Sequence, residues 1–152
     1  MPYPTLIPAP AATYDALYAH FGDPRLAGFE DAHIVTATHQ IAKSQVIHVR
    51  CHKLIIAKLQ AVWDDLHNSG HLGLIQSYDG CFVIRSIRGS THPSLHSWGL
   101  AIDLNADRFP LGSLKKQDPY LTAAFAKQGF FAGENFCHRH DPMHFEYTTG
   151  AI

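Results

Sequence analysis

Two short clusters of histidine and acidic residues, far apart in the chain, constrain the fold most strongly. The first, HSWGLAID, begins at His96 and ends at Asp103, and the second, DPMHFE, runs from Asp141 through His144 to Glu146. Imidazole and carboxylate groups are zinc ligands, and a catalytic zinc takes three of them from the protein. We therefore expect a fold in which the clusters meet, with one zinc per chain on His96, Asp103 and His144.

The composition favours one domain without a nucleic-acid-binding surface. The chain has 152 residues, of which 46% are hydrophobic, enough to fill one core. We expect a single domain over residues 1–152 that begins with an extended, proline-spaced arm at 1–12. The 12 Lys and Arg residues nearly balance the 13 Asp and Glu residues. Because nucleic-acid binders carry a basic surface, we expect no nucleic-acid partner, and we expect a monomer.

The sequence contains no recognisable membrane span or secretion signal. No apolar run approaches the roughly 18 residues that a spanning helix needs. The first basic residue is Arg25, and Pro2, Pro4, Pro8 and Pro10 interrupt any apolar segment before it. We expect synthesis in the cytoplasm without a signal peptide.

Histidine is frequent, whereas cysteine offers no pairing pattern. The 12 histidines favour metal or proton chemistry, but they also reduce the weight of any single one. Cys51, Cys81 and Cys137 are odd in number and form no Cys-x-x-Cys pair, so we expect free thiols. Cys137, His138 and His140 flank the second cluster, and their part in metal binding is left open.

Three segments have the pattern of helices. Thr13 can cap a helix over residues 14–21. Apolar residues at helical spacing predict the main core helix at 47–68, before Gly70. Asp118 and the proline after it predict the start of a helix that ends at Gly129.

The remaining regular pattern is that of short strands. These are 34–37, 74–78, 81–87, 100–104 and 143–147. The Asp-Gly dipeptide at 79–80 fits a two-residue turn, so we expect 74–78 and 81–87 to form a hairpin. Alternation places the Asp103 side chain away from the core and puts His144 and Glu146 on one face of the last strand.

Peptide hydrolysis at such a zinc also needs a group that accepts a proton from the attacking water. Asp141 is the preferred candidate because a turn into the last strand can aim it at the metal. Glu146 is the alternative, but it is better placed to accept a hydrogen bond from an imidazole N–H. Arg85 is our candidate for polarising the scissile carbonyl and stabilising the oxyanion, which is worth about 3 kcal/mol. Arg88 is the second choice.

Three stretches together resemble the VanY-type D-alanyl-D-alanine carboxypeptidase family of zinc peptidases. They are RSIRGS from Arg85, SLHSWGLAIDLN from Ser94 and DPMHFE from Asp141. The family includes phage endolysins that cut L-alanyl-D-glutamate bonds, and the resemblance covers about residues 80–147. The chain departs from it where many relatives have Trp-Gly-Gly and this sequence has FAGEN, and in the CHRH segment that precedes Asp141.

The resemblance implies zinc on His96, Asp103 and His144, the general base at Asp141, and substrate carbonyl or carboxylate binding at Arg85. It also implies an α+β fold, with a small antiparallel β-sheet, helices packed on one side and the zinc site on the open face. The wider group that shares this fold contains lysostaphin and the hedgehog signalling domain.

The expected function is zinc-dependent hydrolysis of peptidoglycan stem peptides by metal-activated water, at either the D-Ala-D-Ala or the L-Ala-D-Glu bond. Such an enzyme would act at the bacterial cell wall after release. The alternative is a non-catalytic, zinc-containing recognition module of the hedgehog-like fold. Asp141 favours the enzyme, because a structural zinc has no need of a general base.

Four further residues are expected to support the metal ligands or contact the substrate. They are Ser94, Arg88, Glu146 and Trp98. For Trp98, packing at the rim of the site is favoured over stacking on a substrate.

Overall fold

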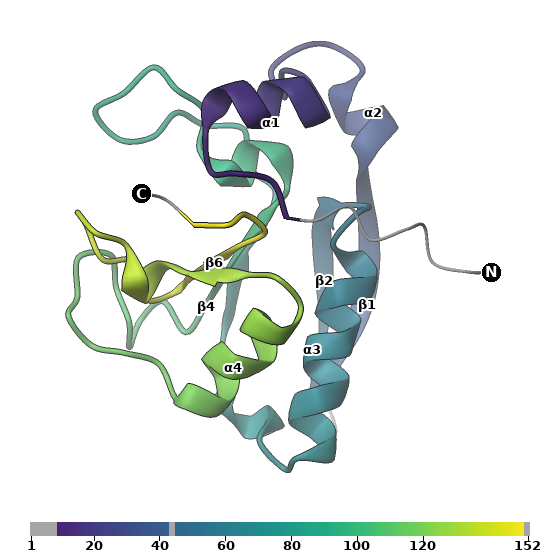
Figure 1. Cartoon of the computed structure of the whole chain (residues 1–152). Coiled ribbons are helices and arrows are strands. Elements are labelled where there is room, and N and C mark those ends of the chain that lie inside the picture. The colour runs from purple at the N-terminus through teal and green to yellow at the C-terminus, as the bar shows by residue number, and fades with distance from the viewer. Residues whose placement is uncertain (1–8, 43–44, 151–152) are drawn as a thin grey trace.

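The computed structural model describes residues 9–42 and 45–150, which form an α+β fold with antiparallel sheets and helices, as expected (Figure 1). Residues 1–8 of the predicted arm lie outside the described residues. The helices of the described part are α1 (Tyr14–Phe21), α2 (Phe29–His33), α3 (Ile56–Asn68) and α4 (Pro119–Lys127), with short 3-10 helices η1 (Leu72–Leu74), η2 (Leu95–Trp98) and η3 (Gly133–Asn135).

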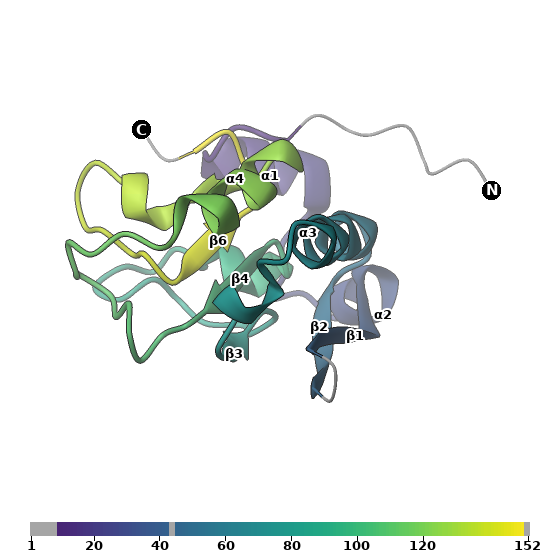
Figure 2. The same cartoon turned by 90° about the horizontal axis from the view of Figure 1, so that it is seen from below.

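The strands of the described residues form two antiparallel sheets. One is a hairpin of β1 (Ile34–Ala42) and β2 (Gln45–His52). The other has the order β3-β4-β6-β5, with β3 at Tyr78–Gly80, β4 at Ala101–Leu104, β6 at His144–Glu146 and β5 at Phe131–Ala132. Seen from below, α3 lies between the hairpin and α4 (Figure 2), and in Figure 1 it lies in front of the hairpin.

The strands β4 and β6 alternate between the core and the opposite face as predicted. Ile102 and Leu104 are fully buried in the hydrophobic core, whereas Asp103 points to the other side. In β6, the ring of Phe145 stacks on Phe125 of α4 with centroids 4.1 Å apart. The two central strands are therefore anchored on one face by apolar packing, which leaves the other face for polar side chains.

The predicted helix over 47–68 is wrong in its first part. Residues 45–52 form β2, and the helix begins only at Ile56. The apolar side chains of Ile47, Val49 and Cys51 follow every second residue and are buried, which is the period of a strand. Of these three, only Ile47 and Cys51 are four residues apart and also fit the helical spacing that continues into α3. Pairing with β1 decides the outcome.

The predicted hairpin of 74–78 and 81–87 is also wrong. β3 pairs with β4 instead, and the Asp79 carboxylate accepts hydrogen bonds from the Ser77 hydroxyl and the Ala106 amide. Residues 82–85 have no regular strand structure. The Asp-Gly pair lies at a register shift of the β3–β4 ladder rather than in a tight turn, because the long-range pairing replaces the local one.

The other predicted elements are present. Thr13 caps α1 by accepting a hydrogen bond from the Ala16 amide at 3.2 Å, and Asp118 caps α4 by accepting one from Tyr120 at 2.9 Å. The short strand predicted at 34–37 is the start of the longer β1, whose partner β2 was missed.

Candidate metal centre

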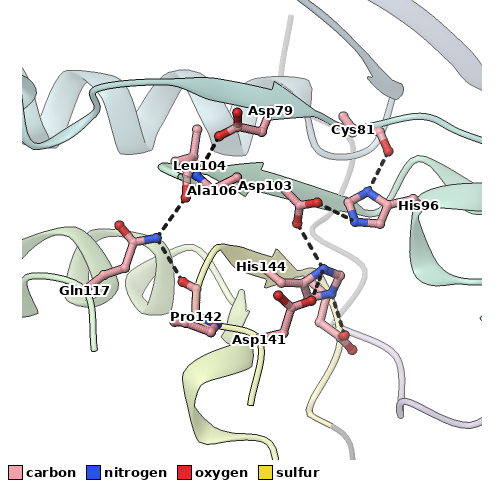
Figure 3. A network of polar contacts seen from close by, with 11 residues as sticks. Asp79, Cys81, His96, Asp103, Leu104, Ala106, Gln117, Asp141, Pro142 and His144 are labelled. Atoms are coloured by element: carbon pink, nitrogen blue, oxygen red, sulfur yellow. Dashed lines mark hydrogen bonds and ion pairs between the residues drawn. The ribbon is translucent and has the colours of Figure 1, made fainter. Parts of the chain in front are cut away.

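The three predicted metal ligands lie together on the polar face of the β3-β4-β6-β5 sheet. The Asp103 carboxylate stands between two imidazoles (Figure 3): Oδ2 is 3.2 Å from Nε2 of His96 and Oδ1 is 3.2 Å from Nδ1 of His144. One ligand atom from each residue lies within 4.8 Å of the others. This spacing allows a single cation to contact all three.

Strand register and one glycine produce this geometry. Asp103 and His144 are direct partners in the β4–β6 ladder, so their side chains project from neighbouring strands on one face. His96 comes from η2, which ends at Gly99 with φ +68°. A Cβ at Gly99 would lie 2.6 Å from the His52 amide nitrogen, so only glycine permits the turn that joins η2 to β4.

Each imidazole is held by its second ring nitrogen. Nδ1 of His96 is 2.7 Å from the Cys81 carbonyl oxygen, which can only accept a hydrogen bond. Nε2 of His144 is 2.9 Å from Oε1 of Glu146, whose other oxygen accepts a hydrogen bond from Thr148. These contacts orient the two ring nitrogens that face Asp103, in the way that outer hydrogen bonds orient metal-binding imidazoles.

The electrostatics of the group suit a cation. Burial opposes the charged form of His144, but hydrogen bonds to Asp103 and Glu146 outweigh it and raise the pKa of His144 to about 10. Burial likewise disfavours the Asp103 anion, yet the hydrogen bonds from His144 and His96 lower the pKa of Asp103 below its usual value. Two nitrogens and one carboxylate oxygen around this centre fit the donor set of a catalytic zinc, which uses three protein ligands.

Asp141 lies beside the group without joining its hydrogen bonds. Its Oδ2 is 3.9 Å from Nδ1 of His144, and its buried Oδ1 has no hydrogen-bond partner among the residues that the structure describes. Burial, with the negative charge of Asp103, raises the pKa of Asp141, against the opposing influence of His144, His96 and Arg85. Asp141 is therefore a weaker acid than an ordinary aspartate, and it lies beside the candidate metal ligands.

The backbone around Asp141 is fixed by Gly133 of η3. The Asp141 amide donates to the Gly133 carbonyl at 2.9 Å, and the Asp141 carbonyl accepts from the His144 amide at 3.0 Å. A Cβ at Gly133 would overlap the Asp141 carbonyl oxygen. The turn before β6 therefore requires glycine at position 133.

Gln117 ties the same turn to β4, and sequence reasoning missed it. Its buried side-chain amide donates to the carbonyls of Leu104 at 3.1 Å and Pro142 at 2.9 Å (Figure 3). Its Oε1 accepts from Asn105 at 2.8 Å. The only local signal is that Gln117 precedes the Asp118 cap, and nothing there indicates a contact with residue 142.

A cavity of about 740 Å³ opens onto the centre. It is lined by His96, Asp141, His144, Glu146, Arg85, Arg88 and Ser94, together with residues of α1 and the segments at 111, 136 and 139. The Arg85 backbone is fixed by Ser97, whose hydroxyl accepts from the Arg85 amide and donates to its carbonyl. Ser94 is buried with its hydroxyl unpartnered among the described residues.

Other candidate residues lie elsewhere. Trp98 is fully buried, and its indole N–H donates to the Gly22 carbonyl at 2.9 Å, which agrees with a packing role. Within the part of the chain that the structure describes, Cys137, His138 and His140 are not members of the converging group. Nδ1 of His140 bonds to the Glu134 carbonyl instead.

Fold and site together define an α+β protein with a His–Asp–His group and a further carboxylate, Asp141, at the edge of a cavity. Residues 88–147 match the family model described as D-alanyl-D-alanine carboxypeptidase. The match supports the VanY-type resemblance and a peptidase, and its range includes His96, Asp103, Asp141 and His144. No curated protein and no solved structure gives a significant match. No helix of the described residues is long and apolar enough to cross a membrane.

Proposed function

We propose that the protein is a zinc peptidase that hydrolyses amide bonds in peptidoglycan stem peptides. The observation that carries the proposal is the position of Asp141, whose carboxylate lies at a cavity that adjoins the His–Asp–His group and has one buried oxygen, Oδ1, without a hydrogen-bond partner among the described residues. The match of this segment to a carboxypeptidase family indicates the substrate class. Such a substrate would place the action of the protein at the bacterial cell wall.

The residues that would hold zinc are His96 through Nε2, Asp103 through a carboxylate oxygen and His144 through Nδ1. When bound, the ion supplies Lewis-acid chemistry and lowers the pKa of water to about 7. Glu146 and the Cys81 carbonyl keep both imidazoles in the ligating orientation.

Asp141 then accepts the proton of the attacking water and returns it to the nitrogen of the leaving amine. Its raised pKa supports both transfers, because a carboxyl that is too acidic would release the proton to solvent instead of retaining it. Arg85 lines the same cavity. From there it would donate hydrogen bonds to the carbonyl oxygen as negative charge develops, an effect worth about 3 kcal/mol.

A non-catalytic zinc module is the second candidate. Structural zinc sites are closed by four protein ligands, whereas the converging group among the described residues has three. A buried carboxylate oxygen without a hydrogen bond, such as Oδ1 of Asp141, also lowers stability, and a purely structural zinc site has no use for it. Both observations favour the enzyme. The described residues share one hydrophobic core, which supports a single domain.

The proposal is tested by digesting purified peptidoglycan with the zinc-loaded protein and identifying the released termini by mass spectrometry. Loss of a terminal D-Ala would identify a carboxypeptidase, and new L-Ala and D-Glu termini an endopeptidase. The Asp141→Asn variant should keep one zinc per chain and lose at least about 100-fold in rate. Undiminished hydrolysis would remove Asp141 from its role, and intact peptidoglycan with zinc-loaded, folded wild-type protein would favour the non-catalytic module.

A further inference from the structure

Two of the three cysteines lie together in the core. Cys51, near the end of β2, and Cys81, directly after β3, are buried free thiols, whereas Cys137 is an exposed one. The Cys81 thiol lies 3.6 Å from the Gly99 carbonyl oxygen, to which it donates, and it is also in hydrogen-bond contact with the Cys51 thiol. The two sulfur atoms are therefore neighbours.

The backbone next to both cysteines is joined by a direct hydrogen bond. The Phe82 amide donates to the Arg50 carbonyl at 3.0 Å, which links the residue after Cys81 to the residue before Cys51. Neighbouring hydrogen-bonded strands have Cα separations of about 4.5–5.5 Å, and a disulfide spans about 4.4–6.8 Å. Backbones held this close allow a bond between the two sulfur atoms with little movement of the chain.

The pair stands between the two sheets. Cys51 belongs to the β1–β2 hairpin and Cys81 follows the first strand of the other sheet, and no ladder joins these sheets among the described residues. The Cys81 carbonyl accepts the hydrogen bond from Nδ1 of His96 at 2.7 Å (Figure 3). A covalent bond between the cysteines would therefore attach the residue that orients His96 to the hairpin.

We propose that Cys51 and Cys81 are a disulfide-forming pair, which stays reduced in a reducing environment and becomes a Cys51–Cys81 disulfide when the chain folds in an oxidising one. The oxidant is a small disulfide such as oxidised glutathione. One cysteine thiolate attacks it to give a mixed disulfide, and the second displaces glutathione from that intermediate. The Sγ–Sγ bond forms, the glutathione disulfide breaks, and two electrons and two protons pass from the cysteines to two glutathione thiols.

Burial determines when this bond forms. The Cys51 and Cys81 side chains are 0% and 2% exposed, so glutathione does not reach either sulfur atom in the folded protein. Exchange takes place while the chain folds, before the core closes. An oxidising environment at that stage is found outside the cytosol. The inference does not depend on the peptidase function.

The disulfide should stabilise the fold. It closes a loop that contains α3 and η1, and closure of a loop of about 30 residues restricts the unfolded chain. We expect Tm of the oxidised protein to lie about 5–10 °C above that of the reduced protein.

The test refolds the full chain from denaturant in a glutathione redox buffer and, in parallel, in dithiothreitol. Free thiols are then alkylated under denaturing conditions, and the bonds are located by tryptic mapping without reductant. A Cys51–Cys81 bond links tryptic peptide 51–53 to tryptic peptide 59–85. Cys137→Ser is the matched control, because it removes the exposed thiol and leaves the buried pair intact. The reduced wild type is the reference for Tm and needs no substitution in the core.

The oxidised wild type should have one reactive thiol site, at Cys137, where the reduced protein has three. It should contain the linked peptides and show the higher Tm, and the Cys137→Ser variant should do the same. Refolded protein that keeps both buried thiols free, or that carries glutathione on them instead of the link, would overturn the proposal. A linked protein whose Tm is unchanged or lower also contradicts it, because such a bond would not fit the native fold.

Discussion

Glu146 accepts a hydrogen bond from Nε2 of His144 over 2.9 Å, and these two residues are separated by one position on the same strand. Alternation along β6 gives them the same face, and the buried carboxylate also holds the Thr148 hydroxyl at 2.6 Å. The orientation of one predicted metal ligand is therefore determined within three residues of sequence.

Replacing Glu146 by Gln should weaken zinc binding by about 10-fold to 100-fold, because the amide is a poorer acceptor for the imidazole N–H. Competition with a chromophoric chelator measures the affinity. Glu30→Gln is the matched control, since Glu30 pairs with Arg50 in a half-exposed ion pair away from the site. Equal affinities for Glu146→Gln and wild type would show that the contact does not support the metal ligand.

Removal of a predicted metal ligand should weaken zinc binding more than the Glu146→Gln change does. His96→Ala is expected to lose stoichiometric zinc and, with it, the rise in Tm on zinc addition, because a ligand that binds only the native state stabilises it. Elemental analysis and thermal unfolding with and without chelator measure both quantities. Full zinc content in this variant would exclude His96 from the ligand set.

Gly133, which packs against the Asp141 carbonyl, allows a steric test of the turn before β6. Gly133→Ala should destabilise the protein by about 1–3 kcal/mol, since its Cβ would overlap the Asp141 carbonyl, and it should also lower hydrolysis by displacing Asp141. Gly73→Ala is the control, because a Cβ there meets no atom within 4 Å. Denaturant unfolding gives the free energy of unfolding of both variants. Similar values would mean that the turn can shift to accommodate a methyl group at position 133.

Gln117→Ala should lower the free energy of unfolding by about 1–3 kcal/mol for each buried group left unpaired, since the carbonyls of Leu104 and Pro142 lose their donor. Gln60→Ala provides the comparison, because the Gln60 amide bonds to Asp64 on the exposed face of α3. If the two variants unfold at the same denaturant concentration, the network around Gln117 contributes nothing to stability.

The lowered pKa of the buried His52 predicts that the stability of the protein depends on pH. Burial, with smaller contributions from His33 and Lys53, lowers the pKa of His52 to about 4. The unfolded chain, with a His pKa of about 6.5, then binds more protons than the native state between these two values. Stability is full above about pH 6.5 and falls by up to about 3 kcal/mol towards pH 4. Unfolding of wild type and His52→Gln across this range should give a shallower slope for the variant, and parallel curves would contradict the assignment.

The convergence of His96, Asp103 and His144 could be predicted from the sequence because these residues lie in two short motifs whose strand alternation is local. Asp103, His144 and Glu146 follow directly from the two-residue period of β4 and β6. The predictions of secondary structure were wrong where a strand pairs with a segment that is distant in the sequence. Ile47 and Cys51 are four residues apart and extend the helical spacing of α3, and only the pairing of β1 with β2 shows that this segment is a strand. Asp79 next to glycine likewise resembles a hairpin turn until β3 pairs with β4.

Gln117 illustrates the remaining limit. A glutamine that bonds to Leu104 and Pro142 has no sequence pattern of its own, because tertiary packing alone places it between them. Arg139 is similar, since only the folded structure shows that it lines the same cavity as Arg88.

The register that places Asp103 opposite His144 also sets a condition on when the protein can become active. The two residues are 41 positions apart, and loop closure over such a distance occurs only when the last strand docks beside β4. A partly folded chain would offer isolated ligands of low affinity. For the proposed zinc enzyme, tight metal binding would therefore require that β4 and β6 are already paired.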